Sequence, residues 1–400
     1  MTAARSPVGS RRTDNACEIA ALRRGFALPA AIMALVVIAA LIAATLVVSA
    51  EELRAGRTDV AAQRALASAE VALDRAIATW DARLNVSARV GETRLLASSS
   101  IRSAGGHTVA ESVVVTATRV RERAFWLTAR ATSNADGRPI PARVTIAATT
   151  RLLAPTVPVA AALTVGGAAT IAGGTVDGRG AGSGGCPDGA TDGPDAPGDA
   201  AGVIARDTSR VCGIDCADGL PLGVQGTPPV ASDAGLTTDS ATLVSVVAAL
   251  GARATVVAPG GELVPRPLEA DGECARAERT NWGDPSGGSC ADYYPVIRIT
   301  GDATLMAGSI GQGILLVAGS LTVRAGARFD GVVIATNDVH VVGPGAELRG
   351  VVIAMDGGAG DGSSVRDGGA IRFSGCAARR ARLGAGRLTR TPDRWWAELR

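Results

Sequence analysis

The sequence has no lysine, only two histidines and few aromatic residues, and these scarcities restrict what the protein can do. All 40 basic residues are arginines, and 38 acidic residues nearly balance them, so the formal net charge is +2. Residues 26–400 carry 35 arginines and 36 acidic residues. Because this part has no basic surplus, we expect no nucleic-acid partner. His107 and His340 are the only imidazole groups, and neither a Ser-His-Asp order nor a phosphate-binding loop accompanies them. The sequence therefore predicts a protein that is not an enzyme and that holds no cofactor.

Charge is also absent from one long stretch near the N-terminus. Residues 26–50 contain no charged side chain, and they include Leu35, Leu41 and Leu46. A helix rises about 1.5 Å per residue, so this stretch is long enough to span a bilayer. Residues 1–25 carry five arginines and two acidic residues, which keeps them in the cytoplasm by the positive-inside rule. We therefore expect a single-pass membrane protein whose remaining chain lies outside the cytoplasm.

A short motif stands directly before this apolar stretch. The sequence Arg23-Arg24-Gly25-Phe26 is the clearest candidate processing site, and it precedes the apolar run. A secretory signal is instead cleaved after its apolar segment. The order of motif and apolar run in this chain resembles the class III signal of type IV pilins and type II secretion pseudopilins, which prepilin peptidase cuts between the positions of Gly25 and Phe26. The resemblance implies that residues 1–25 are a leader and that Phe26 becomes a methylated N-terminus with the helix still attached. A plain single-pass anchor is the alternative.

The fifth residue after the expected cleavage site is Ala30. In the major pilins that the motif resembles, this place holds a glutamate that pairs with the N-terminal amine of a neighbouring subunit. A carboxylate is tolerated in apolar surroundings when a cation meets it, so a subunit with alanine here lacks that docking interaction. Ala30 argues against a bulk filament subunit and for a rare or tip-proximal one, with drift within the family as the alternative.

The helix is expected to continue beyond the membrane and to join a small sheet. Within residues 51–83 the apolar side chains largely recur three or four positions apart, which predicts an amphipathic helix. Residues 63–73 are similar to the Ala-Glu-rich extension of minor pilins of the PilX kind. Three later segments alternate apolar and polar residues and predict an antiparallel meander, namely 107–120, 123–132 and 140–153. Residues 51–153 would thus form a pilin-like head.

The distal part repeats short apolar runs at a nearly constant period. Four runs, 296–299, 314–317, 332–335 and 351–354, begin 18, 18 and 19 residues apart. Gly313, Gly331 and Gly350 directly precede the last three. A fixed period of this size marks a solenoid, whose repeats stack because none can bury its apolar face alone. We expect a parallel β-helix over residues 154–378.

Other segments complete this predicted domain. Residues 162–178 have the same pattern of strand segments separated by glycine, and they are expected to supply a first repeat. Residues 179–235 are rich in Gly, Asp, Pro and Cys, which indicates a surface insertion. Residues 237–252 are the one later helix candidate, and residues 379–400 are expected to form a C-terminal tail.

Cysteines predict how the distal domain is cross-linked. Seven cysteines become six once Cys17 leaves with the leader, and an even set outside the cytoplasm suits three disulfides, with fifteen possible connectivities. The six candidates are Cys186, Cys212, Cys216, Cys274, Cys290 and Cys376. Short spacing favours bridges from Cys212 to Cys216 and from Cys274 to Cys290, which leaves Cys186 and Cys376 to join the start of the domain to its end. Zinc would need a second close pair beside Cys212 and Cys216, so we expect no metal.

A few distal side chains leave alternatives open. His340 lies on a predicted strand, where it is expected to face solvent rather than to act as a base. Four residues, Trp282, Asp284, Tyr293 and Tyr294, either line a sugar-binding surface or pack a loop against the solenoid. Two loops, 188–199 and 356–367, carry spaced aspartates suited to calcium but do not match its strict loop pattern, so we expect plain surface loops.

The distal sequence extends the resemblance over most of the chain. Four blocks, 281–285, 311–317, 373–376 and 394–398, resemble the C-terminal region of PilX-type pilus assembly proteins. We predict an α+β fold, in which a long N-terminal transmembrane helix and a small antiparallel sheet precede an all-β parallel β-helix domain.

The resemblance implies a minor pilin or pseudopilin that takes part in assembling a type IV pilus or a type II secretion pseudopilus, as a tip or priming subunit. Its partners would be prepilin peptidase, the bacterial inner membrane and other pilins. The β-helix would lie in the periplasm and then at the cell surface, facing an unidentified surface or polysaccharide ligand. The alternatives are a membrane-anchored envelope adhesin outside any filament and, more remotely, a carbohydrate-active enzyme.

Overall fold

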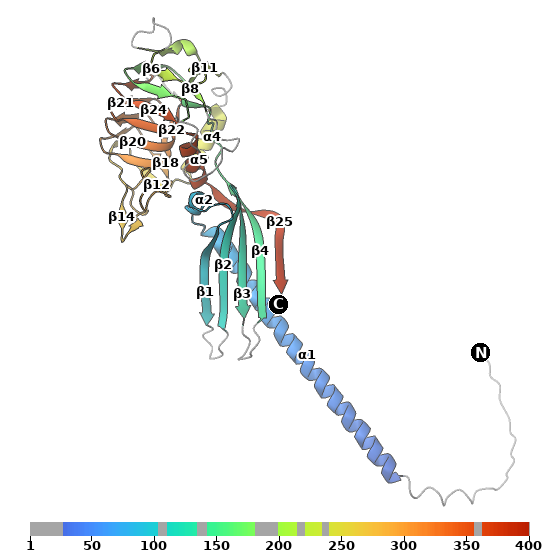
Figure 1. Cartoon of the computed structure of the whole chain (residues 1–400). Coiled ribbons are helices and arrows are strands. Elements are labelled where there is room, and N and C mark those ends of the chain that lie inside the picture. The colour runs from blue at the N-terminus through green and yellow to red at the C-terminus, as the bar shows by residue number, and fades with distance from the viewer. Residues whose placement is uncertain are drawn as a thin grey trace, which may run out of the picture.

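The computed structural model describes residues 27–102, 110–133, 142–180, 199–213, 221–233, 240–355 and 362–399. A long helix leads into a five-stranded antiparallel sheet, and beyond that sheet lies a distal domain built on two parallel sheets (Figure 1). The fold is therefore α+β, as the sequence predicts. We call the helix and the antiparallel sheet the head, and residues 154–386 the distal domain.

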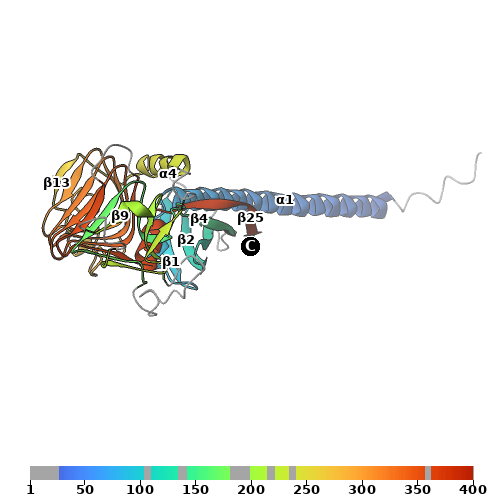
Figure 2. The same ribbon diagram turned by 90° about the horizontal axis from the view of Figure 1, so that it is seen from above.

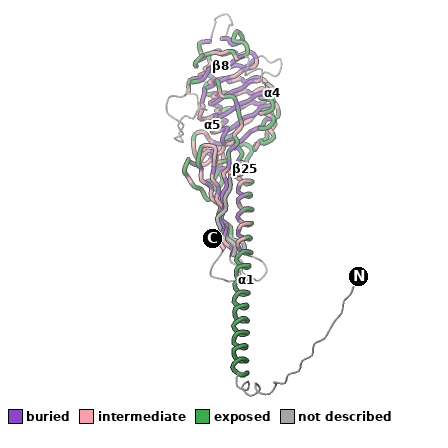
Figure 3. Tube along the Cα trace, turned by 90° about the vertical axis from the view of Figure 1, so that its right-hand side faces the viewer, coloured by how far each residue is buried: buried purple, intermediate pink, exposed green. Residues whose placement is uncertain are grey.

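Helix α1 (Ala27–Ala78) has two halves with different surroundings. Its first half is exposed on every side, and its second half is buried along one face (Figure 3). The buried side chains follow each other at intervals of four or three residues and are nearly all alanine: Ala61, Ala65, Ala69, Leu73 and Ala76. Such spacing places them on one side of the helix, and their small size lets the sheet come close.

The head sheet has the strand order β1-β2-β3-β4-β25, and every neighbouring pair is antiparallel. Its strands are β1 (Thr93–Arg102), β2 (Ala110–Arg121), β3 (Ala124–Ser133), β4 (Ala142–Leu153) and β25 (Arg387–Leu399). In β3, alternate residues from Phe125 to Ala131 are buried beneath α1. The structure thus contains the predicted meander and adds two edge strands that were not predicted. A one-turn helix, α2 (Leu84–Ser87), precedes β1.

The distal domain is an insertion into the head sheet. It leaves the head after Leu153, at the end of β4, and returns at Arg387, the first residue of β25. These two residues are direct partners in the antiparallel ladder. The prediction of a C-terminal tail at 379–400 is therefore wrong. Helix α5 (Gly375–Gly384) lies against the distal domain, and β25 completes the head because its backbone pairs with β4.

All strand pairs within the two distal sheets are parallel, and two isolated antiparallel bridges, Gly173 with Arg366 and Arg179 with Asp199, lie outside the named pairs. The larger sheet contains β5 (Ala161–Val165), β7 (Thr175–Asp177), β8 (Ala201–Ala205), β10 (Val224–Gln225), β11 (Val230–Ser232), β12 (Val256–Ala258), β16 (Val296–Ile299), β18 (Ile310–Val317), β20 (Arg328–Ala335), β22 (Glu347–Ala354) and β24 (Ala370–Phe373). The smaller sheet contains β6 (Ala169–Ala172), β9 (Val211–Cys212), β13 (Gly261–Leu263), β17 (Ala303–Leu305), β19 (Leu321–Arg324), β21 (Val339–Val342) and β23 (Ser363–Arg366). From β16 to β24 the chain alternates between the two sheets at every strand, and the apolar residues between the sheets form the larger core.

Glycines stand in the middle of three long strands of the larger sheet. Gly313, Gly331 and Gly350 have φ of 113°, 142° and 137°, in the region that disfavours a side chain. In these strands, the residues before the glycine and the residues after it can pair with different neighbouring strands. Residues 314–317 of β18 pair with β16, whereas residues 347–350 of β22 pair with β24. The strands therefore change sides of the stack at these glycines.

The stacking order differs from the chain order. The predicted first repeat, residues 162–178, does not precede the others but lies beyond the last of them, with β5 beside β22, β6 beside β23 and β7 beside β24. The predicted insertion 179–235 also contributes strands β8 to β11 at this far end. Helix α4 (Ser240–Gly251), inside the predicted 237–252, runs outside the sheets and connects this end to β12 (Figure 2). Hydrophobic periodicity identified the strands, but it is a local property and does not specify stacking order.

Candidate assembly surface and domain junction

The exposed half of α1 carries most of the exposed large apolar side chains among the described residues. From Ala27 to Val60 every residue is exposed, and charge first appears at Glu51. Leu35, Leu41 and Leu46 are each more than 60% exposed. The helix is long and apolar enough to cross a membrane, and an exposed surface of this kind indicates contact with lipid or with other apolar helices. Ala30 lies in its first turns, whereas Gly25 and Phe26 lie outside the described residues.

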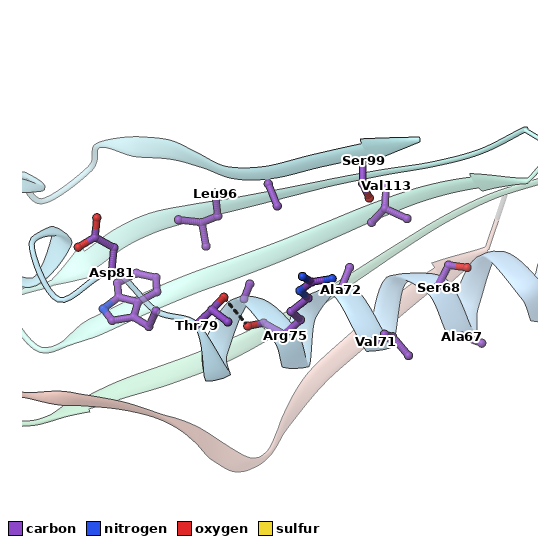
Figure 4. A pocket seen from close by; sticks show the side chains of 13 residues that line it. Ala67, Ser68, Val71, Ala72, Arg75, Thr79, Asp81, Leu96, Ser99 and Val113 are labelled. Atoms are coloured by element: carbon purple, nitrogen blue, oxygen red, sulfur yellow. Dashed lines mark hydrogen bonds between the residues drawn. The ribbon is translucent and has the colours of Figure 1, made fainter. Parts of the chain in front are cut away.

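A groove separates the packed half of α1 from the edge of the head sheet (Figure 4). It arises because α1 lies mainly over β3 and β4, which leaves β1 without a helix above it. Its volume is about 620 Å³. Val71 and Arg75 line it from the helix, and Leu96 and Val113 line it from the strands. Sequence periodicity indicated the helix but not this groove, because β1 was not predicted.

Asn85 joins the head to the distal domain at its return point. Its side chain is fully buried, and its Nδ2 donates to the carbonyl oxygens of Leu383 at 3.0 Å and Gly386 at 3.1 Å. Its Oδ1 accepts a hydrogen bond of 2.7 Å from Trp80 Nε1. One amide thus links the end of α1 to the segment between α5 and β25. A single asparagine has no sequence pattern that would have revealed this role.

Charged groups surround the same junction. Asp81 lies 2.8 Å from Arg83 in the head and 3.4 Å from Arg276 in the distal domain. Burial alone would raise the pKa of Asp81, but the hydrogen bonds from Arg83 and the charges of Arg83 and Arg276 bring it below its usual value of 3.8. Because this pKa is depressed, the contribution to stability is present at neutral pH and is lost as acid protonates Asp81 below pH 3.8. A second ion pair, Arg379 with Glu122, spans 3.2 Å.

Replacing Asn85 with alanine is expected to destabilise the folded chain by on the order of 3 kcal/mol, because two carbonyls and one indole N–H would lose their buried partner. Chemical denaturation of the detergent-solubilised protein would measure this change. Ser87→Ala, in the same short helix, removes only one local hydrogen bond to Arg83 and serves as the control. Equal stability of the two variants would show that Asn85 does not hold the domains together.

The distal cysteines and aromatics that the sequence singled out are largely structural. Cys274 and Cys290 form a disulfide with an S–S distance of 2.06 Å. Cys212 and Cys376 are also disulfide-bonded, whereas Cys186 and Cys216 lie outside the described residues. Trp282 is 1% exposed and packs edge-on against Phe329, so it packs the loop against the sheets rather than offering a face to a sugar.

The remaining candidates carry no assembled reaction centre among the described residues. His340 on β21 is partly buried, and its Nδ1 lies 3.0 Å from Ser364 Oγ on the next strand. Tyr293 lines a cleft of about 540 Å³ at the domain junction, where burial raises its pKa. No group of three or more His, Cys, Asp or Glu side chains within the described ranges is arranged to hold a metal ion. His107, residues 188–198 and residues 356–361 lie outside those ranges. The expectation of a plain surface loop at 356–367 is wrong over its last part, because Ser363–Arg366 form strand β23 and three of these four residues are buried.

Comparison with known proteins adds one structural similarity. No protein-family model matches the chain, and no curated protein matches its sequence. Among solved structures, the chain is similar to the competence-associated pilin ComZ from Thermus thermophilus, with 12% sequence identity and a TM-score of 0.24. The alignment covers 86% of this chain and 97% of that one. At this TM-score the similarity establishes neither a shared fold nor a shared function.

Proposed function

We propose that the chain is a minor pilin or pseudopilin that assembles through α1 with other pilin-like subunits. The observation that carries this proposal is the two-part helix. Its uncharged first half is wholly exposed, and it continues without interruption into a half whose alanine face packs on an antiparallel sheet. A plain membrane anchor has no need for one continuous helix shared between membrane and head. The Gly25-Phe26 motif ahead of the helix supports the same proposal.

The subunit acts at a tip or in a priming complex rather than along a filament shaft. Ala30 provides no carboxylate for the N-terminal amine of a neighbour. The distal domain extends the head away from α1 (Figure 1), and its bulk opposes close lateral packing. After cleavage by prepilin peptidase, the apolar half would anchor the chain in the inner membrane until assembly extracts it.

The distal domain is, in this proposal, a short parallel β-helix displayed outward. Successive strands pair in register at intervals of 18 and 19 residues, as in Ile314 with Val332 and Val332 with Val351. The strands change sides at a column of glycines, which gives the stack a third side. An envelope adhesin that never enters a filament shares this display role, and processing at Gly25 separates it from a pilin.

Mass spectrometry of the mature N-terminus in the native host tests the proposal. We expect a chain that begins at N-methylated Phe26, and we expect this species to disappear in a strain without prepilin peptidase. Gly25→Arg should block processing in the normal strain, whereas Ala21→Arg, also in the leader, should not. An intact leader, or cleavage behind Ala50, would exclude the pilin assignment and leave an anchored envelope protein.

A further inference from the structure

One outer face of the distal domain carries arginines on successive strands. β20, β22, β24 and β7 are consecutive neighbours in the larger sheet. The residues that pair across them in one outward column are Asp330, Arg349, Arg372 and Asp177. Arg349 and Arg372 are therefore direct partners on strands about 4.8 Å apart. Like charges placed opposite each other across strands oppose folding unless neighbouring carboxylates offset the repulsion.

The carboxylates on this face lie deeper than the arginines. The side chains of Asp177 and Glu347 are 23% and 27% exposed, whereas those of Arg349 and Arg372 are 40% and 60% exposed. Glu347 lies 3.2 Å from Arg372 Nε. Asp330 already receives two hydrogen bonds of 2.9 Å from Arg328, and Arg349 approaches it only to 4.0 Å. The guanidinium of Arg349 thus has donors that this ion pair does not use.

These side chains border a cavity of about 570 Å³ on the same face. Its lining combines three arginines with two carboxylates: Arg179, Arg349, Arg372, Asp177 and Glu347. Arg179 holds Asp177 through hydrogen bonds of 3.0 and 3.1 Å, so its position is set. We propose that this cavity, which we call the arginine cavity, binds a polysaccharide that carries carboxylates, such as a uronic-acid polymer.

Each part of the lining suits this chemistry. A guanidinium offers a planar pair of N–H donors that matches a carboxylate, and Arg349 and Arg372 present two such groups side by side. Asp177 and Glu347 accept hydrogen bonds, which suits the hydroxyl groups of a sugar. Because the arginines lie on neighbouring strands, the site runs along the stack and accommodates an extended chain rather than a single small anion.

The same lining disfavours nucleic acid. Duplex DNA carries one negative charge per about 1.7 Å of its axis, a denser charge than one carboxylate per sugar, and here two carboxylates face the three arginines. Binding of single strands also relies on exposed aromatic faces for base stacking. Phe373, the aromatic residue in this lining, is 1% exposed. This inference is independent of the pilin assignment, since an envelope adhesin would display the same cavity.

Binding of polygalacturonate to the full-length protein in detergent micelles tests the inference. Wild type is expected to bind polygalacturonate and not neutral dextran, measured by biolayer interferometry at physiological salt. The double variant Arg349→Gln and Arg372→Gln should bind at least tenfold more weakly. The matched control, Arg324→Gln with Arg366→Gln, makes the same charge change at two exposed positions on the smaller sheet and should bind like wild type.

Three results would overturn the inference: no binding by wild type, an equal loss in both double variants, or equally tight binding of double-stranded DNA that depends on the same arginines. Thermal unfolding of each variant shows whether the fold is kept. Should the first double variant unfold, Arg372→Lys replaces it, because lysine keeps the ion pair with Glu347 but loses the planar fork. Unchanged binding by Arg372→Lys would likewise overturn the inference.

Discussion

Replacing Gly331 with alanine is expected to unfold the distal domain at physiological temperature. A Cβ atom at this position would lie 2.0 Å from the carbonyl oxygen of Gly313 on the neighbouring strand. Gly350 meets the carbonyl oxygen of Gly331 in the same way, at 1.9 Å. The added methyl group would therefore clash with backbone atoms of the neighbouring strand. Ladder hydrogen bonds hold this backbone on both sides, so it cannot move away as a flexible side chain could. We expect a loss of more than about 4 kcal/mol, which is exceptional for a single methyl group.

Gly326→Ala is the matched control for this prediction. Gly326 also has a positive φ, of 74°, but no atom lies within 4 Å of the place that its methyl group would take. Alanine there adds only the backbone cost of the left-handed region, about 1–2 kcal/mol. Chemical denaturation and limited proteolysis of the two variants would measure the difference. Similar stabilities would show that Gly331 is needed for its backbone angle alone and not for close approach between strands.

The strands of the distal domain were predictable because their signal is local. Each apolar run and the glycine before it can be recognised without knowing its neighbours, and Gly313, Gly331 and Gly350 do align in the sheet. The position of β5 beside β22 was not predictable. This position depends on which two strands pair through their exposed edges. Apolar strands of similar composition offer similar backbone hydrogen-bonding edges, so the sequence does not distinguish the correct partner. Helix α5 was missed for another reason: it is only 10 residues long, and three of them are arginines.

The edge strands of the head were missed for reasons visible in their residues. β1 contains Leu95 and Leu96 in succession, with an irregular register at this point, so the alternation expected of a half-buried strand is broken. β25 contains Pro392 within a second irregularity. Proline is tolerated in a strand at the sheet edge, which is where β25 lies.

Some of the candidate sites could be predicted from the sequence, and others could not. The exposed half of α1 follows directly from the absence of charge in residues 26–50. The arginine cavity also had a signal in the sequence, since Asp330 and Arg349 each precede a repeated glycine. This outward column mixes charges of both signs, however, so it is less conspicuous than the apolar repeat. Asn85 and the groove beside β1 depend on contacts between distant segments and had no such signal.

Removing residues 387–400 is expected to damage the head more than removing the whole distal domain. The short truncation deletes β25, so the backbone of β4 becomes an unpaired edge and the buried Leu388 is lost. Excision of residues 154–386 keeps all five strands. Because Leu153 and Arg387 are direct partners, a two-residue Asn-Gly turn can join them as an ordinary hairpin. The excised chain loses the contacts of Asn85 to Leu383 and Gly386, which lowers its stability without removing its core.

Expression of both variants in the native host distinguishes an inserted domain from an appended one. We expect the excised chain to accumulate in the membrane fraction, to show a cooperative thermal transition after purification in detergent, and to be processed like wild type. The truncated chain should be degraded or aggregate. If the truncated chain folds and the excised chain does not, the head depends on the distal domain rather than on β25. Successful excision would mean that assembly through α1 and display by the distal domain are separable, because the hairpin between β4 and β25 is the covalent point at which they meet.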